Sequence, residues 1–184
     1  IVHYLLEKNR VVGQAAGERN FHIFYQLFGH SELKLGTIED YMYLNVSGCT
    51  TIKGVNDSSS GKDTQNSLDD LNVSKDDQKT LYIALKGILC LGNIRMEKIQ
   101  EDNDLLVCTP ASKQALKNVA DSFGLSHEAL EKALATKVIT AGADTTQVHL
   151  NAAQAVEARN ALAKEVYSRL FDFIIKTANK SLEQ

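Results

Sequence analysis

The sequence has few of the features that mark a membrane protein, a secreted protein or a metalloprotein. No run approaches the roughly eighteen consecutive apolar residues of a membrane span, and the first residues lack the charged-then-apolar layout of a signal peptide. The three cysteines, Cys49, Cys90 and Cys108, form no CxxC pair. We therefore expect reduced thiols and a cytoplasmic protein without a membrane span.

Positive charge is also scarce, because Lys and Arg number 20 against 23 acidic residues and the net charge is −3. No basic stripe is present, and affinity for nucleic acid depends on clustered Lys and Arg. The sequence therefore predicts no nucleic-acid partner. The single proline, Pro110, fits a protein built largely of helices.

Catalytic motifs are absent as well. The chain contains no GxxxxGK[ST], GxGxxG, GxSxG or HExxH pattern. None of the histidines has the spacing of a metal ligand; they are His3, His22, His30, His127 and His149. The acidic pairs Asp69/Asp70 and Asp76/Asp77 suit helix ends better than acid–base catalysis. We expect no catalytic residue and no metal site in this chain.

What remains is a pattern typical of one helical domain. The chain has 184 residues, of which 43% are apolar and 23% charged, so it is expected to fold around one core. Apolar spacing, N-caps and terminal glycines predict four helices before residue 136. They are Phe21 to Phe28 before Gly29, Ser74 to Gly92, Ser112 to Phe123 before Gly124, and His127 to Ala135 capped by Ser126.

The strongest local signal opens the last helix. Asn151 is an N-cap, Gln154 completes a capping box, and Leu150 can pack on Ala155. The apolar positions Leu162, Val166, Leu170 and Ile174 then follow one face over four turns. We expect a long helix with one buried side.

The other segments read as hairpins, a strand and a loop. Short apolar runs predict one hairpin from Ile94 to Val107, with a polar tip at Gln100 to Asp104, and a second from Lys137 to Leu150 that turns near Gly142. Val2 to Val12 has the content of a short strand, and it starts without a cap or turn, as an element cut in its middle would. Gly48 to Leu71 is expected to be a surface loop, with a short helix near Thr64 to Leu71. The predicted fold class is mainly α with short β-hairpins.

Four long segments carry a family resemblance. They are YLLEKNRVVGQAAGERNFHIFYQL from Tyr4 to Leu27, YMYLNVSGCTTIKGVND from Tyr41 to Asp57, SKDDQKTLYIALKGILCLGNI from Ser74 to Ile94, and LNAAQAVEARNALAKEVYSRLFDFIIKTAN from Leu150 to Asn179. In this order they resemble the myosin motor domain, in the region between switch I and switch II. The resemblance covers nearly the whole chain.

The resemblance implies a helical subdomain of the P-loop NTPase myosin head. Residues 1–12 would be the end of a central-sheet strand, and residues 13–184 the upper 50 kDa domain, which forms the upper jaw of the actin-binding cleft. The phosphate loop, switch I and switch II of the family lie outside these residues, and phosphoryl transfer needs them. This chain alone is therefore expected to bind no cofactor and to hydrolyse no ATP, while the intact motor would use Mg-ATP.

The resemblance also implies partners and a location. The expected partners are the actin filament and the rest of the myosin head, and light chains or calmodulin would bind only through regions absent here. The location would be the actin cytoskeleton. A second interpretation stays open, in which the chain is a stand-alone helical interaction module derived from a myosin, without motor activity.

The hairpin from Lys137 to Leu150 corresponds to the family's cardiomyopathy loop, an actin contact. The implied contacts are Lys137, Val138, Ile139, Thr140, Asp144 and Thr145. Myosins tend to carry an acidic residue or a phosphorylatable hydroxyl sixteen positions before their Asp-Ala-Leu-Ala-Lys motif. That motif starts here at Asn160, in place of aspartate, so the position is Asp144. Its charge would be permanent and independent of a kinase. Alternatively, Asp144 only shapes the turn.

Two weaker sites follow from the same resemblance. The tip from Lys98 to Asp104 matches loop four, a secondary actin contact, with Lys98, Glu101 and Asp102 as candidates. Because actin's binding region is also acidic in the family, this tip either contributes little or acts as a spacer. Tyr4, Leu5 and Glu7 match positions near the cleft apex, although such residues also suit any sheet core.

Overall fold

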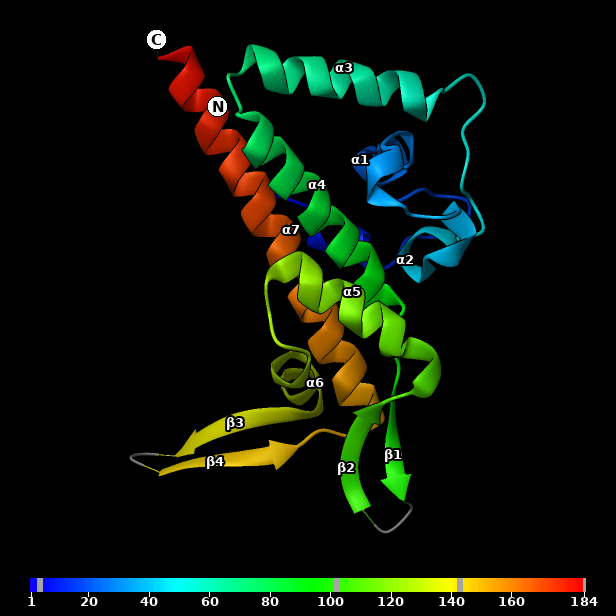
Figure 1. Ribbon diagram of the computed structural model, residues 1–184, viewed down its shortest axis with the longest axis vertical. Helices are drawn as coiled ribbons and strands as arrows, with labels where there is room; N and C mark the ends of the chain where they lie inside the picture. Colours follow the sequence, from blue (N-terminus) through cyan, green and yellow to red (C-terminus); the bar gives the residue numbers. More distant parts are fainter. Residues whose placement is uncertain (3–4, 101–102, 142–143, 184) are drawn as a thin grey trace.

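Helices carry most of the architecture, and two β-hairpins project from one end of it. The computed structural model describes residues 1–2, 5–100, 103–141 and 144–183. The long helix α7 (Ala152–Leu182) runs alongside α4 (Lys75–Gly92), and both hairpins lie at the end where α7 begins (Figure 1). The two chain termini lie near each other at the opposite end. This arrangement agrees with the predicted class, mainly α with short hairpins.

The core lies where α4 meets α1 (His22–Gln26), α2 (Met42–Asn45), α5 (Lys113–Phe123) and α7. Its largest fully buried side chains come from several of these helices, and they include Phe24, Tyr43, Ile88, Leu89 and Leu91. Burial of such side chains contributes about 1.5 to 3 kcal/mol each. One continuous core thus fixes the position of α7 relative to α4.

Helix α4 has the boundaries that its caps predict. The Ser74 hydroxyl accepts a hydrogen bond from the Asp77 N–H at 3.1 Å, as an N-cap does. The helix ends at Gly92, and its apolar face is buried. The prediction for Ser74 to Gly92 is confirmed.

The capping box of α7 is also confirmed. The Asn151 carboxamide oxygen accepts from the Gln154 N–H at 2.9 Å, and the Gln154 carboxamide oxygen accepts from the Asn151 N–H at 3.0 Å. Leu150 and Ala155 belong to one small buried cluster. The predicted stripe from Leu162 to Ile174 packs against the main core.

The remaining predicted helices have close counterparts. Phe21 to Phe28 becomes α1 followed by the 3₁₀ helix η2 (Leu27–Gly29). Helix α5 ends at Gly124, whose φ of 65° is left-handed and suits glycine. Helix α6 (His127–Ala135) is capped by Ser126. The other short elements are η3 (Ser31–Leu33), η4 (Ile38–Asp40) and η5 (Pro110–Ser112).

Both hairpins are antiparallel and two-stranded. Strands β1 (Met96–Gln100) and β2 (Asn103–Cys108) pair from Met96 opposite Cys108, with an irregularity between Lys98 and Gln100. Strands β3 (Thr136–Ala141) and β4 (Asp144–His149) pair in continuous register. Gly142, near which the second turn was predicted, lies outside the described residues.

The segment between residues 48 and 71 differs from the prediction. It contains a helix of 14 residues, α3 (Asp57–Asp70), where a loop with only a short helix was expected. Asn56 caps α3 by accepting from the Ser59 N–H at 3.1 Å. The Thr64 hydroxyl donates to the Gln26 carboxamide oxygen at 2.9 Å. The serine and aspartate residues of this segment favour turns, and these hydrogen bonds stabilise it as a helix instead.

The N-terminal segment differs from the expected strand over its last residues, and its place in a central sheet stays a prediction. Lys8–Val11 form a 3₁₀ helix, η1, which packs against α7. A strand needs a neighbour for its backbone hydrogen bonds. Within the described residues, strand pairing involves only β1 with β2 and β3 with β4. In the same described part, no helix combines the length and apolarity needed to span a membrane.

Candidate functional site: the projecting hairpin

The hairpin of β3 and β4 presents most of its side chains to solvent. Val138 is 64% exposed and Ile139 46%, and their partners across the hairpin are Gln147 and Thr146. Successive side chains of a strand point to opposite faces, so each face of the hairpin carries one of these apolar residues. Such exposed apolar side chains within a polar hairpin are available for contact with another protein.

The base of this hairpin is anchored to the helices. The Leu150 N–H donates to the Ala135 carbonyl oxygen at 2.8 Å, and the Gln147 carboxamide donates to the Thr136 hydroxyl at 2.7 Å. Leu150 and Ala135 are buried together with Leu106 and Ala155. An isolated two-stranded hairpin is only marginally stable in water. The anchor therefore holds the hairpin out from the helices in a defined direction.

All six residues predicted for this site lie on the hairpin, and all are exposed. They are Lys137, Val138, Ile139, Thr140, Asp144 and Thr145. Asp144 is the first residue of β4 and pairs in register with Ala141, while Thr145 pairs with Thr140. Within the described part of the chain, no ion pair joins Asp144 to a Lys or Arg, so its carboxylate faces solvent.

The hairpin of β1 and β2 lies at the same end of the molecule (Figure 1). Its base is fixed by Glu131 of α6, whose carboxylate accepts from the Cys108 N–H at 2.6 Å. Lys98, a predicted contact, is exposed on β1 opposite Leu106. The other two predicted contacts, Glu101 and Asp102, lie outside the described residues.

Two of the three predicted apex residues, Leu5 and Glu7, lie within the described residues. Tyr4 lies outside the described residues, and Leu5 is 97% exposed. The Glu7 carboxylate pairs with the Arg10 guanidinium at 2.7 Å, which also contacts Glu18 at 3.0 Å. These ion pairs raise the pKa of Arg10, with Glu7 as the largest cause.

The turn from Leu91 to Asn93 is a junction that the sequence reasoning did not identify. Arg159 of α7 is buried, and its Nη1 donates to the carbonyl oxygens of Gly92 at 3.2 Å and Ile94 at 2.9 Å. The Asn93 carboxamide donates to the Asp40 carbonyl oxygen at 2.6 Å and accepts from the Met42 N–H at 3.0 Å. One turn thus joins α4, α7 and α2.

Asn160 extends the same junction. Its carboxamide oxygen accepts from the Tyr43 hydroxyl at 2.7 Å and from Arg159 Nη2 at 3.0 Å. Burial lowers the pKa of Arg159 and raises that of Tyr43. A signal for Arg159 was present in the sequence, because this charged residue stands four residues from Ala155 and Ala163, on the buried side of α7.

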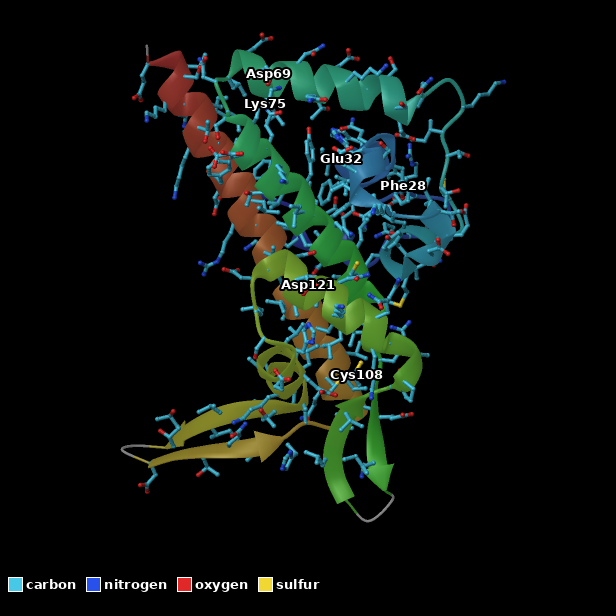
Figure 2. All side chains as sticks on the ribbon, in the orientation of Figure 1. Phe28, Glu32, Asp69, Lys75, Cys108 and Asp121 are labelled. Carbon is cyan, nitrogen blue, oxygen red and sulfur yellow. The ribbon has the colours of Figure 1, made fainter. Side chains whose placement is uncertain are left out.

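The described residues hold no metal cluster, and two of the three cysteines are buried. Among the residues that the structure describes, no group of His, Cys, Asp and Glu is arranged to hold a metal ion. Cys90 and Cys108 are buried and unpaired, and burial raises the pKa of each thiol to about 11 (Figure 2 labels Cys108). Thiols that stay protonated at neutral pH are poor nucleophiles.

These features define a mainly helical unit with two solvent-facing hairpins on a long helix. Residues 1–184 match the family described as myosin head (motor domain). The chain is 37% identical to Myosin-1 of Arabidopsis thaliana, over 97% of this chain and 16% of that protein. It is 37% identical to Myosin ID heavy chain of Dictyostelium discoideum, over 99% and 17% respectively, and 35% identical to unconventional myosin-Ia of Rattus norvegicus, over 100% and 22%.

The chain therefore belongs to the myosin head family, as its four sequence segments predicted. It spans about a fifth or less of the length of these relatives.

Proposed function

We propose that this chain is the upper jaw of the actin-binding cleft in an actin-activated, ATP-driven motor. In this proposal it is the helical upper domain of a P-loop NTPase head, and the ATP site lies in other parts of the protein. The partners are the actin filament and the rest of the head, and the location is the actin cytoskeleton. The observation that carries the proposal is the exposed hairpin of β3 and β4, which is fixed to the start of α7.

The geometry of α7 suits a mechanical connection. A helix of 31 residues is about 46 Å long at 1.5 Å per residue. Its first residue follows the hairpin, and its last turns lie beside the N-terminal residues at the other end. The Asn179 carboxamide donates to the Ile1 carbonyl oxygen at 2.8 Å. A displacement at that end would move the hairpin because α7 and α4 share one packed core.

Within this proposal, Asp144 supplies a permanent negative charge to the actin contact. Its carboxylate is exposed and unpaired within the described residues, so it is free to meet a basic side chain of a partner. A serine or threonine at the same place would need phosphorylation to carry charge. The motor would therefore work without phosphorylation at this position.

The test is kinetic and uses the full-length motor that contains this chain. Asp144→Ala should lower the actin-activated ATPase rate relative to the basal rate measured in the same preparation. The matched control is Asp63→Ala, because Asp63 is an exposed carboxylate on α3, at the other end of the molecule. Loss of both rates in equal proportion would assign Asp144 a structural role and contradict the proposal.

The coding sequence that flanks this chain distinguishes the motor from the alternative interpretation, a stand-alone interaction module. A motor requires that the reading frame continue upstream through a GxxxxGK[ST] loop and downstream through an Asp-x-x-Gly-Phe-Glu motif. A reading frame that lacks both would favour a module without motor activity.

A further inference from the structure

Helix α6 contacts both projecting hairpins, close to the point where each of them leaves the helices (Figure 1). Its last residue, Ala135, is followed directly by Thr136, the first residue of β3. The position of α6 is fixed in turn by Leu130 and Leu134, which are buried in the main core. This helix is therefore a common base for the two hairpins.

The hairpin of β3 and β4 completes the end of α6. The Thr136 hydroxyl donates to the Lys132 carbonyl oxygen at 2.8 Å, and the Leu150 N–H donates to the carbonyl oxygen of Ala135. The last carbonyl groups of a helix have no partner within it, so they depend on donors such as these. The hairpin of β3 and β4 must therefore follow any displacement of α6.

The hairpin of β1 and β2 is tied to α6 through the Glu131 side chain. The Thr109 N–H donates across the hairpin to the Arg95 carbonyl oxygen at 3.0 Å. Neighbouring N–H groups along a strand point to opposite edges, so the Cys108 N–H points away from β1. The Glu131 carboxylate accepts from this Cys108 N–H at 2.6 Å. Glu131 thus links α6 to the outer edge of β2, where strand donors otherwise stay unpaired.

This bond adds direction to a contact that is otherwise apolar. Leu106 of β2 is buried with Ala135, Leu150 and Ala155, and this cluster attaches the base of the hairpin. Apolar attraction has no preferred direction, whereas a hydrogen bond weakens steeply when it is bent. Next to the cluster, a cavity of about 420 Å³ is lined by β2, α6, β3 and β4, so side chains do not fill the space between the hairpins there. The bond to Glu131 therefore restricts how the hairpin of β1 and β2 is oriented about its base.

Both hairpins have side chains that such an orientation would present to a partner. Ile99 of β1 lies at the register irregularity between Lys98 and Gln100 and is 48% exposed. Irregularities of this kind redirect a side chain. Val138 and Ile139 are exposed on the other hairpin, at the same end of the molecule. The relative orientation of the hairpins thus determines how these apolar side chains are arranged.

We propose that Glu131 is a positioning residue for the actin contact. By holding the edge of β2 to α6, it keeps the two hairpins in one relative orientation, so that they meet the filament as a single surface. A preorganised surface loses less conformational freedom on binding, and its affinity is higher for that reason. Glu131 acts through the Cys108 N–H and does not itself touch the filament. The inference rests on the proposed function, because that function names the filament as the partner.

The experiment measures the actin dependence of the ATPase rate in the full-length motor. Glu131→Ala removes the acceptor, and the KM for actin should rise about three- to tenfold while kcat at saturating actin stays near the wild-type value. Glu131→Gln keeps a side-chain oxygen that accepts from the Cys108 N–H, so its KM should stay within about twofold of the wild type. The control for charge is Glu128→Ala, which removes an exposed carboxylate one turn earlier on α6 and should leave KM unchanged.

Hydrogen exchange of the same motors without actin tests the positioning itself. In Glu131→Ala, exchange in the peptide that contains Cys108 should be about five- to tenfold faster than in the wild type, because one hydrogen bond at the edge of β2 is lost. Glu131→Gln should exchange as the wild type does. Exchange in α4 should be the same in all variants, which shows that the core is intact.

The inference is overturned if Glu131→Ala leaves either the exchange of β2 or the KM for actin unchanged. It is also overturned if Glu131→Gln or Glu128→Ala raises KM as much as Glu131→Ala does. Asp144→Ala, measured alongside, separates this inference from the proposed function. Lower actin activation in Asp144→Ala with an unchanged KM in Glu131→Ala rejects the positioning role alone, whereas a wild-type motor that actin does not activate contradicts the proposed function, whatever the exchange rates are.

Discussion

Arg159, in the first third of α7, donates from Nη1 to the carbonyl oxygen of Gly92 at the end of α4, over 3.2 Å. The last carbonyl groups of a helix have no partner within it. Here Arg95 Nη1 donates to the Gly92 oxygen at 2.8 Å, and the buried Arg159 side chain, from a helix distant in the sequence, supplies a second donor. The contact fixes α7, which carries the hairpin of β3 and β4, to α4 at the centre of the core.

Replacing this side chain should loosen that connection. Arg159→Met keeps most of the volume but removes one donor each from the carbonyl oxygens of Gly92 and Ile94, and two from the Asn160 carboxamide oxygen. Arg95 Nη1 still donates to both carbonyl oxygens, at 2.8 and 3.2 Å, so we expect the free energy of unfolding to fall by about 1 to 2 kcal/mol, from the lost bonds to the charged guanidinium. Urea denaturation of the wild type and the variant measures this change in the free energy of unfolding.

The control for this variant is Arg169→Met on the same helix. The Arg169 side chain is 79% exposed and pairs with Glu165, four residues away. An exposed pair of this kind contributes little. Equal destabilisation by the two variants would contradict the role assigned to Arg159.

A side chain at position 92 should destabilise the protein for a steric reason. A Cβ atom at Gly92 would lie 2.9 Å from the Tyr43 ring, which is fully buried and cannot move aside. Gly92→Ala should therefore destabilise the protein by about 1 to 3 kcal/mol. Gly13→Ala, where no atom lies within 4 Å of the added carbon, should have no such effect. Thermal melting of both variants tests the difference.

Stability should also fall at alkaline pH because of Cys90. Burial raises the pKa of its folded-state thiol to about 11, from 9.0. Between these values the folded state keeps a proton that the unfolded state has released, so the stabilisation present below pH 9 is lost as pH rises toward 11. The contribution is at most about 1.4 kcal/mol per pH unit.

The measurement is the free energy of unfolding from pH 8 to pH 10.5. Cys90→Ala should show a shallower decline than the wild type, whatever its stability at pH 8. Ile88→Val, which removes a buried methyl group and leaves the thiol in place, should keep the wild-type slope. Parallel curves for Cys90→Ala and the wild type would show that this thiol does not contribute.

Local signals in the sequence located the elements with clear caps, and contacts between distant segments decided the rest. Ser74, Gly124 and the pair of Asn151 and Gln154 act within one or two turns, so their effect can be inferred from spacing. Helix α3 depends on Thr64 bonding to Gln26, 38 residues away, which no spacing reveals. Lys8–Val11 form a 3₁₀ helix where a strand was expected for a related reason, since a strand needs a neighbouring strand for its backbone hydrogen bonds.

The functional residues also fall into a part that the sequence predicted and a part that it did not. The exposed hairpin followed from short apolar runs and from the resemblance, and the six residues predicted for it all lie on it. The junction of Arg159 with Gly92 was not predicted, because it joins residues 67 positions apart. An arginine on an otherwise apolar helix face was the only trace of it in the sequence.

Asn160 offers a test of why an aspartate is usual at this place in the family. The carboxamide oxygen accepts from Tyr43 and from the buried guanidinium of Arg159, which has no carboxylate among these partners. Asn160→Asp would place a counter-charge on a cation whose pKa burial already lowers. Charge-assisted bonds are about twice as strong as neutral ones, so we expect a gain of about 1 kcal/mol at pH 7.

The pH dependence separates this explanation from a gain by packing alone. Arg159 holds the new carboxyl in its charged form, so its folded-state pKa should lie below the value of about 3.9 in the unfolded chain. The added stability should then be complete above that value and disappear as pH falls through the folded-state pKa. Chemical denaturation of Asn160→Asp at pH 7 and pH 3 measures this. A loss of stability at pH 7 would mean that the desolvation of two charges outweighs their attraction.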